Sequence, residues 1–136
     1  MDAFQDEGVV FAAVGHREAL GLAERGLGLL RHRFGAGVGL AVSASAGFRV
    51  HRLPGSDVRA LAAVLAGRGS RRVLAHGTGA VTTGDTALLD LEARVQQPLC
   101  VRWARGQLAL TMAGRFANGA SLRGELQQDG AVFASD

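Results

Sequence analysis

The single cysteine and the four histidines are the first candidates for catalysis or metal binding in this sequence. No two histidines are spaced three or four residues apart, and none has an acidic residue nearby in a metal-ligand pattern, so we expect no zinc site. Cys100 lies on the strand face opposite Leu99 and Val101, and nothing close to it in the sequence would activate its thiol. We interpret it as a buried structural thiol. The histidines are His16, His32, His51 and His76.

Residues 77–84 form the segment most like a phosphate-binding loop, because they hold three glycines and three threonines. The common phosphate loop needs a lysine after its last glycine, and this sequence contains no lysine. The segment therefore predicts an ordinary loop. Thr82 and Thr83 stay open as hydroxyl nucleophiles.

Composition narrows the classes of function. All 15 basic residues are arginine, the net charge is only +3, and tyrosine is absent, so few aromatic side chains could stack on bases. The densest basic cluster, Arg68, Arg71 and Arg72, keeps an RNA-binding module as an alternative, but we expect no nucleic-acid binding.

No apolar run reaches the roughly 18–20 residues that span a membrane, and the acidic N-terminus is unlike a signal peptide. One cysteine excludes an internal disulfide, so we expect a cytoplasmic protein.

Hydrophobic periodicity predicts short strands and three helices within one domain. Clustered strands with a hairpin favour an α+β fold over a doubly wound parallel sheet. Single strands are predicted at residues 9–14, 38–43, 48–52 and 72–76, and a last strand begins at Val132 and Phe133. A hairpin is predicted between the strand at 72–76 and the last helix, with alternating apolar residues on one face: Leu99, Val101 and Trp103 in its first strand, and Leu108, Leu110 and Met112 in its second. The predicted helices cover residues 17–33, the segment from an N-cap at Ser56 to Gly67, and the segment from Asn118 to Gly130, with Leu122 and Leu126 facing inward.

Two packing features follow from these elements. Gly21, Gly26 and Gly28 interrupt the first helix, and such glycines usually mark close packing against a sheet. Trp103 continues the apolar face of the hairpin, so we expect its side chain to be mostly buried.

A series of short motifs runs in one order along nearly the whole chain. Asp-Glu-Gly-Val-Val-Phe at 6–11 is followed by Gly15-His16, Glu18-Ala19, Gly26-Leu27, His32-Arg33, Thr82-Thr83-Gly84, Gln97-Pro98, Leu108-Ala109-Leu110 and Gly130-Ala131-Val132-Phe133. Together these motifs resemble the class II glutamine amidotransferase domains. The resemblance implies a layered αββα-type sandwich of the N-terminal-nucleophile hydrolase kind, here in a shortened form.

The resemblance also locates the positions at which that family carries its catalytic residues. The family nucleophile is an N-terminal cysteine whose own amino group acts as the base, and the matching position is Gly8. The oxyanion hole is an Asn-Gly pair that matches Ala113 and Gly114, so the side-chain donor is missing. The arginine and tyrosine that hold the substrate carboxylate match Gly79 and Ala80.

We therefore predict a catalytically inactive domain over residues 1–136. Its vestigial pocket comprises Gly8, Arg33, Thr82, Thr83, Ala113 and Gly114. We expect no cofactor, no metal and no glutamine binding. We predict that the domain functions by binding a partner protein or a second copy of itself, most simply as a homodimer. This is expected because a shortened sandwich leaves apolar faces uncovered.

Two expectations stay open beside this one. The competing hypothesis is an amide- or amino-acid-binding enzyme with Thr82, Thr83 or Cys100 as nucleophile. We also expect a natural short protein, in which Asp136 matches a family aspartate only through a deletion.

Overall fold

The computed structural model describes residues 8–65, 69–79, 97–114 and 116–133. The strands within these ranges are β1 (Gly8–Val14), β2 (Gly37–Ala44), β3 (Gly47–Pro54), β4 (Arg72–Thr78), β5 (Leu99–Trp103) and β6 (Gly106–Leu110). The helices are α1 (Ala19–Leu30), α2 (Val58–Leu65) and α4 (Gly119–Gln128), and a 3-10 turn, η1 (Arg31–Arg33), follows α1 directly.

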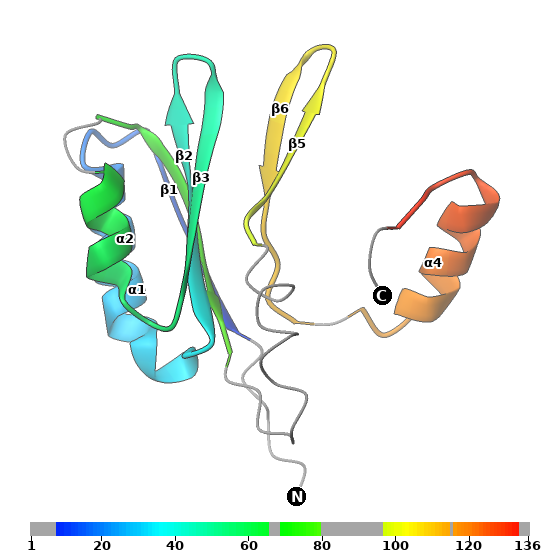
Figure 1. The fold of residues 1–136 in the computed structure, drawn as a ribbon, viewed down its shortest axis with the longest axis horizontal. Helices are drawn as coiled ribbons and strands as arrows, with labels where there is room; N and C mark the ends of the chain where they lie inside the picture. The colour runs from blue at the N-terminus through cyan, green and yellow to red at the C-terminus, as the bar shows by residue number, and fades with distance from the viewer. Residues whose placement is uncertain (1–7, 66–68, 80–96, 115, 134–136) are drawn as a thin grey trace, which may run out of the picture.

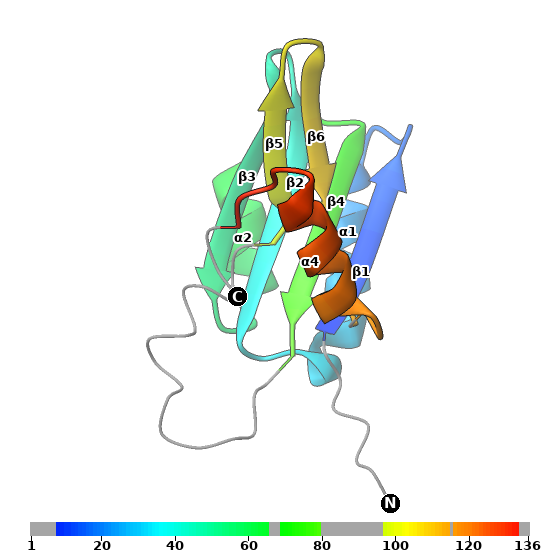
Figure 2. The same ribbon diagram turned by 90° about the vertical axis from the view of Figure 1, so that its right-hand side faces the viewer.

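The described elements stack in the order helix, sheet, sheet, helix. Helices α1 and α2 cover one face of the four-stranded sheet, and the β5–β6 hairpin lies over the other face (Figure 1). Figure 2 shows α4 on the outer side of the hairpin, as the fourth layer. The predicted α+β sandwich is confirmed, with a second sheet of only two strands in the described part of the chain.

The main sheet has the strand order β1-β4-β2-β3, and all its pairings are antiparallel. Strand β2 is buried from Gly37 to Val42 without alternation. Helices cover one of its faces and the hairpin the other, and a strand covered on both faces has no exposed side to carry polar residues. The small side chains of this strand let both layers approach closely.

Both helices bury the stripes that their spacing predicts. Ala19, Ala23 and Leu27 of α1 are fully buried, and Leu20 and Leu30 pack against the same core. In α2 the buried residues are Val58, Leu61, Ala62 and Leu65. These residues and the inner face of the sheet form one hydrophobic core.

The glycines of α1 differ in their surroundings. A Cβ atom at Gly26 would overlap the ring of Phe11 in β1, so this glycine allows close packing, as predicted. A Cβ atom at Gly21 or Gly28 would meet nothing within 4 Å. The prediction is wrong for those two positions, because they lie on the side of the helix away from the sheet.

The N-cap of helix α2 lies one residue later than predicted. The carboxylate of Asp57 accepts a hydrogen bond from the backbone nitrogen of Ala60 at 3.0 Å, which is the bond that an N-cap side chain makes. Asp57 is therefore the cap in place of Ser56. The predicted stop at Gly67 lies outside the described residues.

Three further expectations are wrong within the described residues. Gly77 and Thr78 belong to β4 and not to a loop, because both pair with β1 and β2. Val132 and Phe133 form no strand; the ring of Phe133 instead lies 4.5 Å beneath the guanidinium of Arg123. Trp103 is 49% exposed, because α4, the described element on that side of the hairpin, buries none of its own residues and does not cover the tryptophan.

Helix α4 begins after Asn118, as predicted, and is followed by Gly130, which has a φ of +93°. No residue of this helix is buried, and Leu126 is 40% exposed. The helix therefore forms a layer that does not contribute to the core.

Candidate functional site

One end of the main sheet gathers several of the residues that the sequence singles out. Gly8 of β1 pairs with Thr78 of β4, and Thr78 pairs in turn with Gly37 of β2. The carbonyl of Thr78 accepts hydrogen bonds from the backbone nitrogens of Gly35 and Ala36, at 3.1 and 3.2 Å. These bonds hold the segment that follows η1 against the end of β4.

Arg33 is placed at this end by the chain that follows it. It is the last residue of η1, and its side chain is exposed. The next residue, Phe34, is buried, and its ring occupies the space that a side chain at Gly77 would need. The packing of Phe34 on β4 therefore fixes where the Arg33 backbone lies.

The conformation of Gly8 restricts what can stand at this position. Its φ is +125°, in the region that favours glycine. A Cβ atom built there would overlap the carbonyl oxygen of Gly77. Any other residue would require a shift of the backbone at the first pair of the β1–β4 ladder.

A chain of hydrogen bonds joins the main sheet to the hairpin above this end. Nδ1 of His76 in β4 lies 2.9 Å from the hydroxyl of Thr111, and this hydroxyl donates to the side-chain oxygen of Gln97 at 2.8 Å. The same oxygen of Gln97 accepts a hydrogen bond from the backbone nitrogen of Met112 at 2.6 Å. Three segments that are distant in sequence thus share one polar network.

The network sets the tautomer of His76, and burial favours its neutral form. The hydroxyl of Thr111 has one proton, and it donates that proton to Gln97, so it accepts from His76. Nδ1 of His76 therefore carries a proton. Burial lowers the pKa of His76 from its ordinary value of 6.5, because the imidazole is only 2% exposed. The ring is neutral at pH 7, with Nε2 as its acceptor.

Ala113 and Gly114 follow this network directly. Strands β4 and β6 run in the same direction in Figure 2, so the chain after β6 leads toward the end of the sheet where Gly8 lies. Gly114 has a φ of +116° and turns the chain toward α4. The side chain of Ala113 is a methyl group and has no hydrogen-bond donor. Thr82 and Thr83, the other predicted pocket residues, lie outside the described residues.

The remaining candidates from the sequence lie elsewhere. Cys100 is in β5, where it pairs with Ala109, and it is half-buried. His16 lies before α1 and accepts a hydrogen bond from the backbone nitrogen of Glu18 at 3.1 Å, while His32 is exposed in η1 and His51 lies in β3. Among the described residues, no three histidine, cysteine or acidic side chains are grouped so as to hold a metal ion.

Two solved structures share this arrangement of strands and helices. One is the glutamine phosphoribosylpyrophosphate (PRPP) amidotransferase from B. subtilis, complexed with ADP and GMP, at a TM-score of 0.70 and 25% identity over 93% of this chain. The other is described as the allosteric regulatory enzyme of purine biosynthesis, at a TM-score of 0.71 and 24% identity over 93% of this chain. The chain has the fold of a class II glutamine amidotransferase domain.

This chain matches only part of each of those two proteins. The chain spans 27% and 26% of the lengths of the two structures that it matches. No protein-family model matches the chain, and no curated protein is significantly similar to it in sequence.

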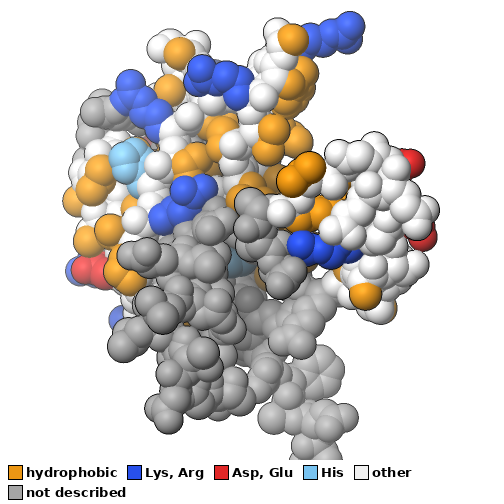
Figure 3. All heavy atoms as spheres, turned by 45° about the vertical axis from the view of Figure 1, so that its right-hand side comes forward, with side chains coloured by type: hydrophobic (Ala, Val, Ile, Leu, Met, Phe, Trp, Pro, Cys, Tyr) orange, Lys and Arg blue, Asp and Glu red, His pale blue; other side chains and the backbone are white. Residues whose placement is uncertain are grey.

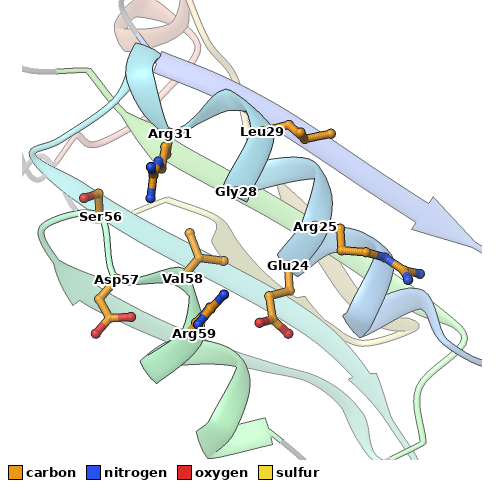
Figure 4. Close-up of a pocket in the computed structure, with 9 residues that line it drawn as sticks. All are labelled: Glu24, Arg25, Gly28, Leu29, Arg31, Ser56, Asp57, Val58 and Arg59. Atoms are coloured by element: carbon orange, nitrogen blue, oxygen red, sulfur yellow. The ribbon is translucent and has the colours of Figure 1, made fainter.

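A shallow groove marks the helical side of this amidotransferase-like fold. It has a volume of about 490 Å³ and lies between α1 and the start of α2 (Figure 4). Its floor includes Gly28 and Val58, and charged side chains of both signs, such as Glu24 and Arg59, surround it. The sheet separates this groove from the side on which the hairpin and the His76 network lie.

None of the described helices is long and apolar enough to cross a membrane. Arg71 and Arg72 of the basic cluster are exposed at the start of β4, and Arg68 lies outside the described residues.

Proposed function

We propose that this chain is a catalytically inactive glutamine amidotransferase-like domain that functions by binding another protein chain. The observation that carries the proposal is Gly8 at the position of the family nucleophile. Its φ of +125° and the nearby carbonyl of Gly77 leave no room for a side chain. A cysteine could serve as nucleophile there only after the backbone had moved.

The oxyanion position supports the same proposal. Class II amidotransferases resemble this chain in having a glycine at the position of Gly114, but the residue before it is Ala113 here. A methyl group cannot donate a hydrogen bond to a tetrahedral oxyanion, and loss of one such donor typically lowers kcat by ~10²–10³. The nucleophile and its stabilising donor are thus absent together.

The position at which the family binds the substrate carboxylate also supports the proposal. The arginine that holds the substrate carboxylate in the family matches Gly79. Glycine has no charge to offer a carboxylate, and Arg33, on the other side of Thr78, is exposed at the end of η1. We therefore expect that glutamine does not bind in this pocket.

Binding another chain is supported by the surface. The hairpin presents large apolar side chains to solvent, and apolar surface of this kind marks interaction sites in soluble proteins. A domain that keeps the sandwich fold without its catalytic groups can still bind another chain through its surface. The cytoplasm is the compartment that we propose for it.

Thermal unfolding with glutamine tests the proposed loss of the pocket. A ligand that binds only the folded state raises Tm by mass action. We expect no change in Tm with millimolar glutamine or glutamate. A rise in Tm that increases with glutamine concentration would contradict the proposal.

A further inference from the structure

The outer face of the hairpin is a continuous row of exposed apolar side chains. The residues on it alternate along both strands and lie opposite one another in the ladder, Leu99 with Leu110 and Val101 with Leu108. The opposite face carries Gln107, whose side chain accepts a hydrogen bond from the backbone nitrogen of Phe48 at 2.5 Å, so that face is turned to the main sheet. The exposed face comprises Leu99, Val101, Trp103, Leu108, Leu110 and Met112, which are between 38% and 55% exposed.

The area of this face is that of an interface. Six such side chains leave on the order of 500 Å² of apolar surface in water, which is near the upper end for the largest patch on a typical monomer. The exposed Phe116, Leu126 and Phe133 around α4 extend it. The total approaches the roughly 800 Å² that each partner buries in a standard protein–protein interface.

The neighbouring helix offers a receptor for a bulky apolar side chain. A groove of about 560 Å³ on α4 is lined mainly by apolar groups, including Phe116, Leu122, Leu126 and Phe133. Trp103 stands at the end of β5 and is 49% exposed. Tryptophan anchors seated in apolar pockets dominate the energetics of many interfaces.

Charge also distinguishes the two parts of this surface. The hairpin carries Arg105 at its tip and no acidic residue, whereas α4 and its C-cap carry Glu125 and Asp129 beside Arg123. Figure 3 shows apolar side chains gathered between the hairpin and α4, a basic group beside them next to α4, a basic group at the end of the hairpin and acidic groups on the outer side of α4. A chain that places its hairpin tip on the α4 of another copy therefore brings Arg105 to an element with two acidic side chains and one basic side chain.

We propose that the outer face of the hairpin binds a second copy of this chain, with Trp103 of each copy filling the α4 groove of the other. The arrangement is reciprocal, so a two-fold axis relates the copies and both apolar surfaces are covered at once. The proposal rests on the binding function proposed above and names its partner. A second copy fits because one chain carries both the hairpin with the exposed Trp103 and the mainly apolar groove on α4.

Sedimentation analysis with two matched valine variants tests the proposal. Val101 and Val64 are both 55% exposed, but Val101 lies on the hairpin face and Val64 lies on α2, on the other side of the main sheet. We expect the wild type and Val64→Asp to be dimers at micromolar concentration. Val101→Asp should dimerise at least about 30-fold more weakly, because a carboxylate would be buried in the centre of the interface.

The fluorescence of Trp103 gives an independent readout, because it is the single tryptophan of the chain. Its emission maximum should shift to shorter wavelength as the wild type is concentrated and should stay constant in Val101→Asp. Circular dichroism of the dilute variants shows whether they fold. If Val101→Asp does not fold, Trp103→Ala, which removes the anchor from a half-exposed position, replaces it in the sedimentation experiment.

Each outcome decides one point. A wild type that stays near 14 kDa at all concentrations overturns the second copy as partner, and a folded Val101→Asp that dimerises as tightly as Val64→Asp overturns the surface. Neither result bears on catalysis. A response to glutamine would contradict the proposed inactivity and leave the dimer untouched, so the two proposals can fail separately.

Discussion

Both the backbone conformation of Gly8 and the space around it require a residue without a side chain. Glycine adopts a φ of +125° without strain, and the carbonyl of Gly77 fills the space beside it. The proposed loss of the nucleophile would therefore involve the geometry of the first strand pair as well as one side chain. Restoring a cysteine would have to overcome both the local conformation and the missing groups around it.

Replacement of Gly8 by cysteine should be both destabilising and inactive. In the full chain we expect Gly8→Cys to cost about 1–3 kcal/mol of stability, from the positive φ and the overlap with Gly77. Gly15→Cys is a matched control, because Gly15 has a φ of +86° but nothing within 4 Å of its Cβ position, and it should cost less. Urea unfolding measures both changes.

A version of Gly8→Cys trimmed so that the cysteine has a free amino group should also release no glutamate from glutamine. The groups at Ala113 and Gly79 that would stabilise the oxyanion and hold the substrate are still absent. Turnover at the rate of an active amidotransferase by this variant would show that the pocket is intact apart from the nucleophile.

His76 should make the stability of the protein depend on pH. Its folded-state pKa is lowered by burial, whereas in the unfolded chain it returns to about 6.5. As the pH falls below about 6.5, the unfolded chain takes up a proton that the folded chain does not, so the free energy of unfolding decreases. Above this range both states are neutral and the contribution is constant.

Thermal unfolding at a series of pH values checks this sign. We expect Tm to fall between pH 6.5 and pH 5 in the wild type and in the control variant His51→Asn, and to fall less in His76→Asn. A Tm of the wild type that rises on acidification in this range would contradict a neutral, buried His76.

At the scale of single elements, much of the structure follows from local pattern. The stripes of α1 and α2 and the strands β1 to β4 lie where their periodicity predicts them, because burial against one layer selects apolar residues at the helical or strand repeat. The cap of α2 was predicted one residue early, since Ser56 and Asp57 are both good caps and adjacent. Local sequence does not decide between them.

Other features depend on partners that are distant in sequence and could not be predicted in this way. Alternation in the hairpin identifies the apolar face with Trp103, but it does not say whether another element covers that face. The His76 network joins residues 35 and 14 positions apart through tertiary packing. A histidine between Ala75 and Gly77 in an apolar strand is the one local sign that a buried polar partner is needed.

Two glycines of α1 should respond in opposite directions to alanine. Gly26→Ala would push a methyl group against the ring of Phe11, so we expect a loss of about 1–3 kcal/mol. Gly28→Ala adds a methyl group in open space on a helix, and we expect a gain of up to about 1 kcal/mol. Chemical denaturation of the two variants measures the difference; equal effects would mean that α1 does not pack on β1 as described.

Backbone exchange should separate α4 from the main sheet. Helix α4 has no buried residue, whereas β2 is buried from Gly37 to Val42. In dilute protein we expect the amides of α4 to exchange with solvent much faster than those of β2, because segments with few buried apolar contacts open at low free energy. Hydrogen exchange followed by mass spectrometry measures this, and equal protection would show that α4 is part of the core.

At the scale of the whole molecule, the four layers are unequal. The helical layer and the main sheet share one core, the hairpin is joined to them by a few hydrogen bonds, and its outer face is open to solvent. Gly8 and the segment that follows Arg33 both contact Thr78 at one end of the sheet, and Gly8 and Arg33 belong to the proposed vestigial pocket. We therefore propose that the sandwich fold is retained, that its pocket lacks the catalytic groups and that its outer surface binds another chain.

Hydrolysis of glutamine by the purified wild-type chain tests this account most directly. Release of glutamate would be measured over time at several protein concentrations, beside an active class II amidotransferase as a positive control. The account predicts no release above the rate without protein, because the nucleophile and the side-chain oxyanion donor are absent. Release that increases in proportion to the protein concentration would contradict it.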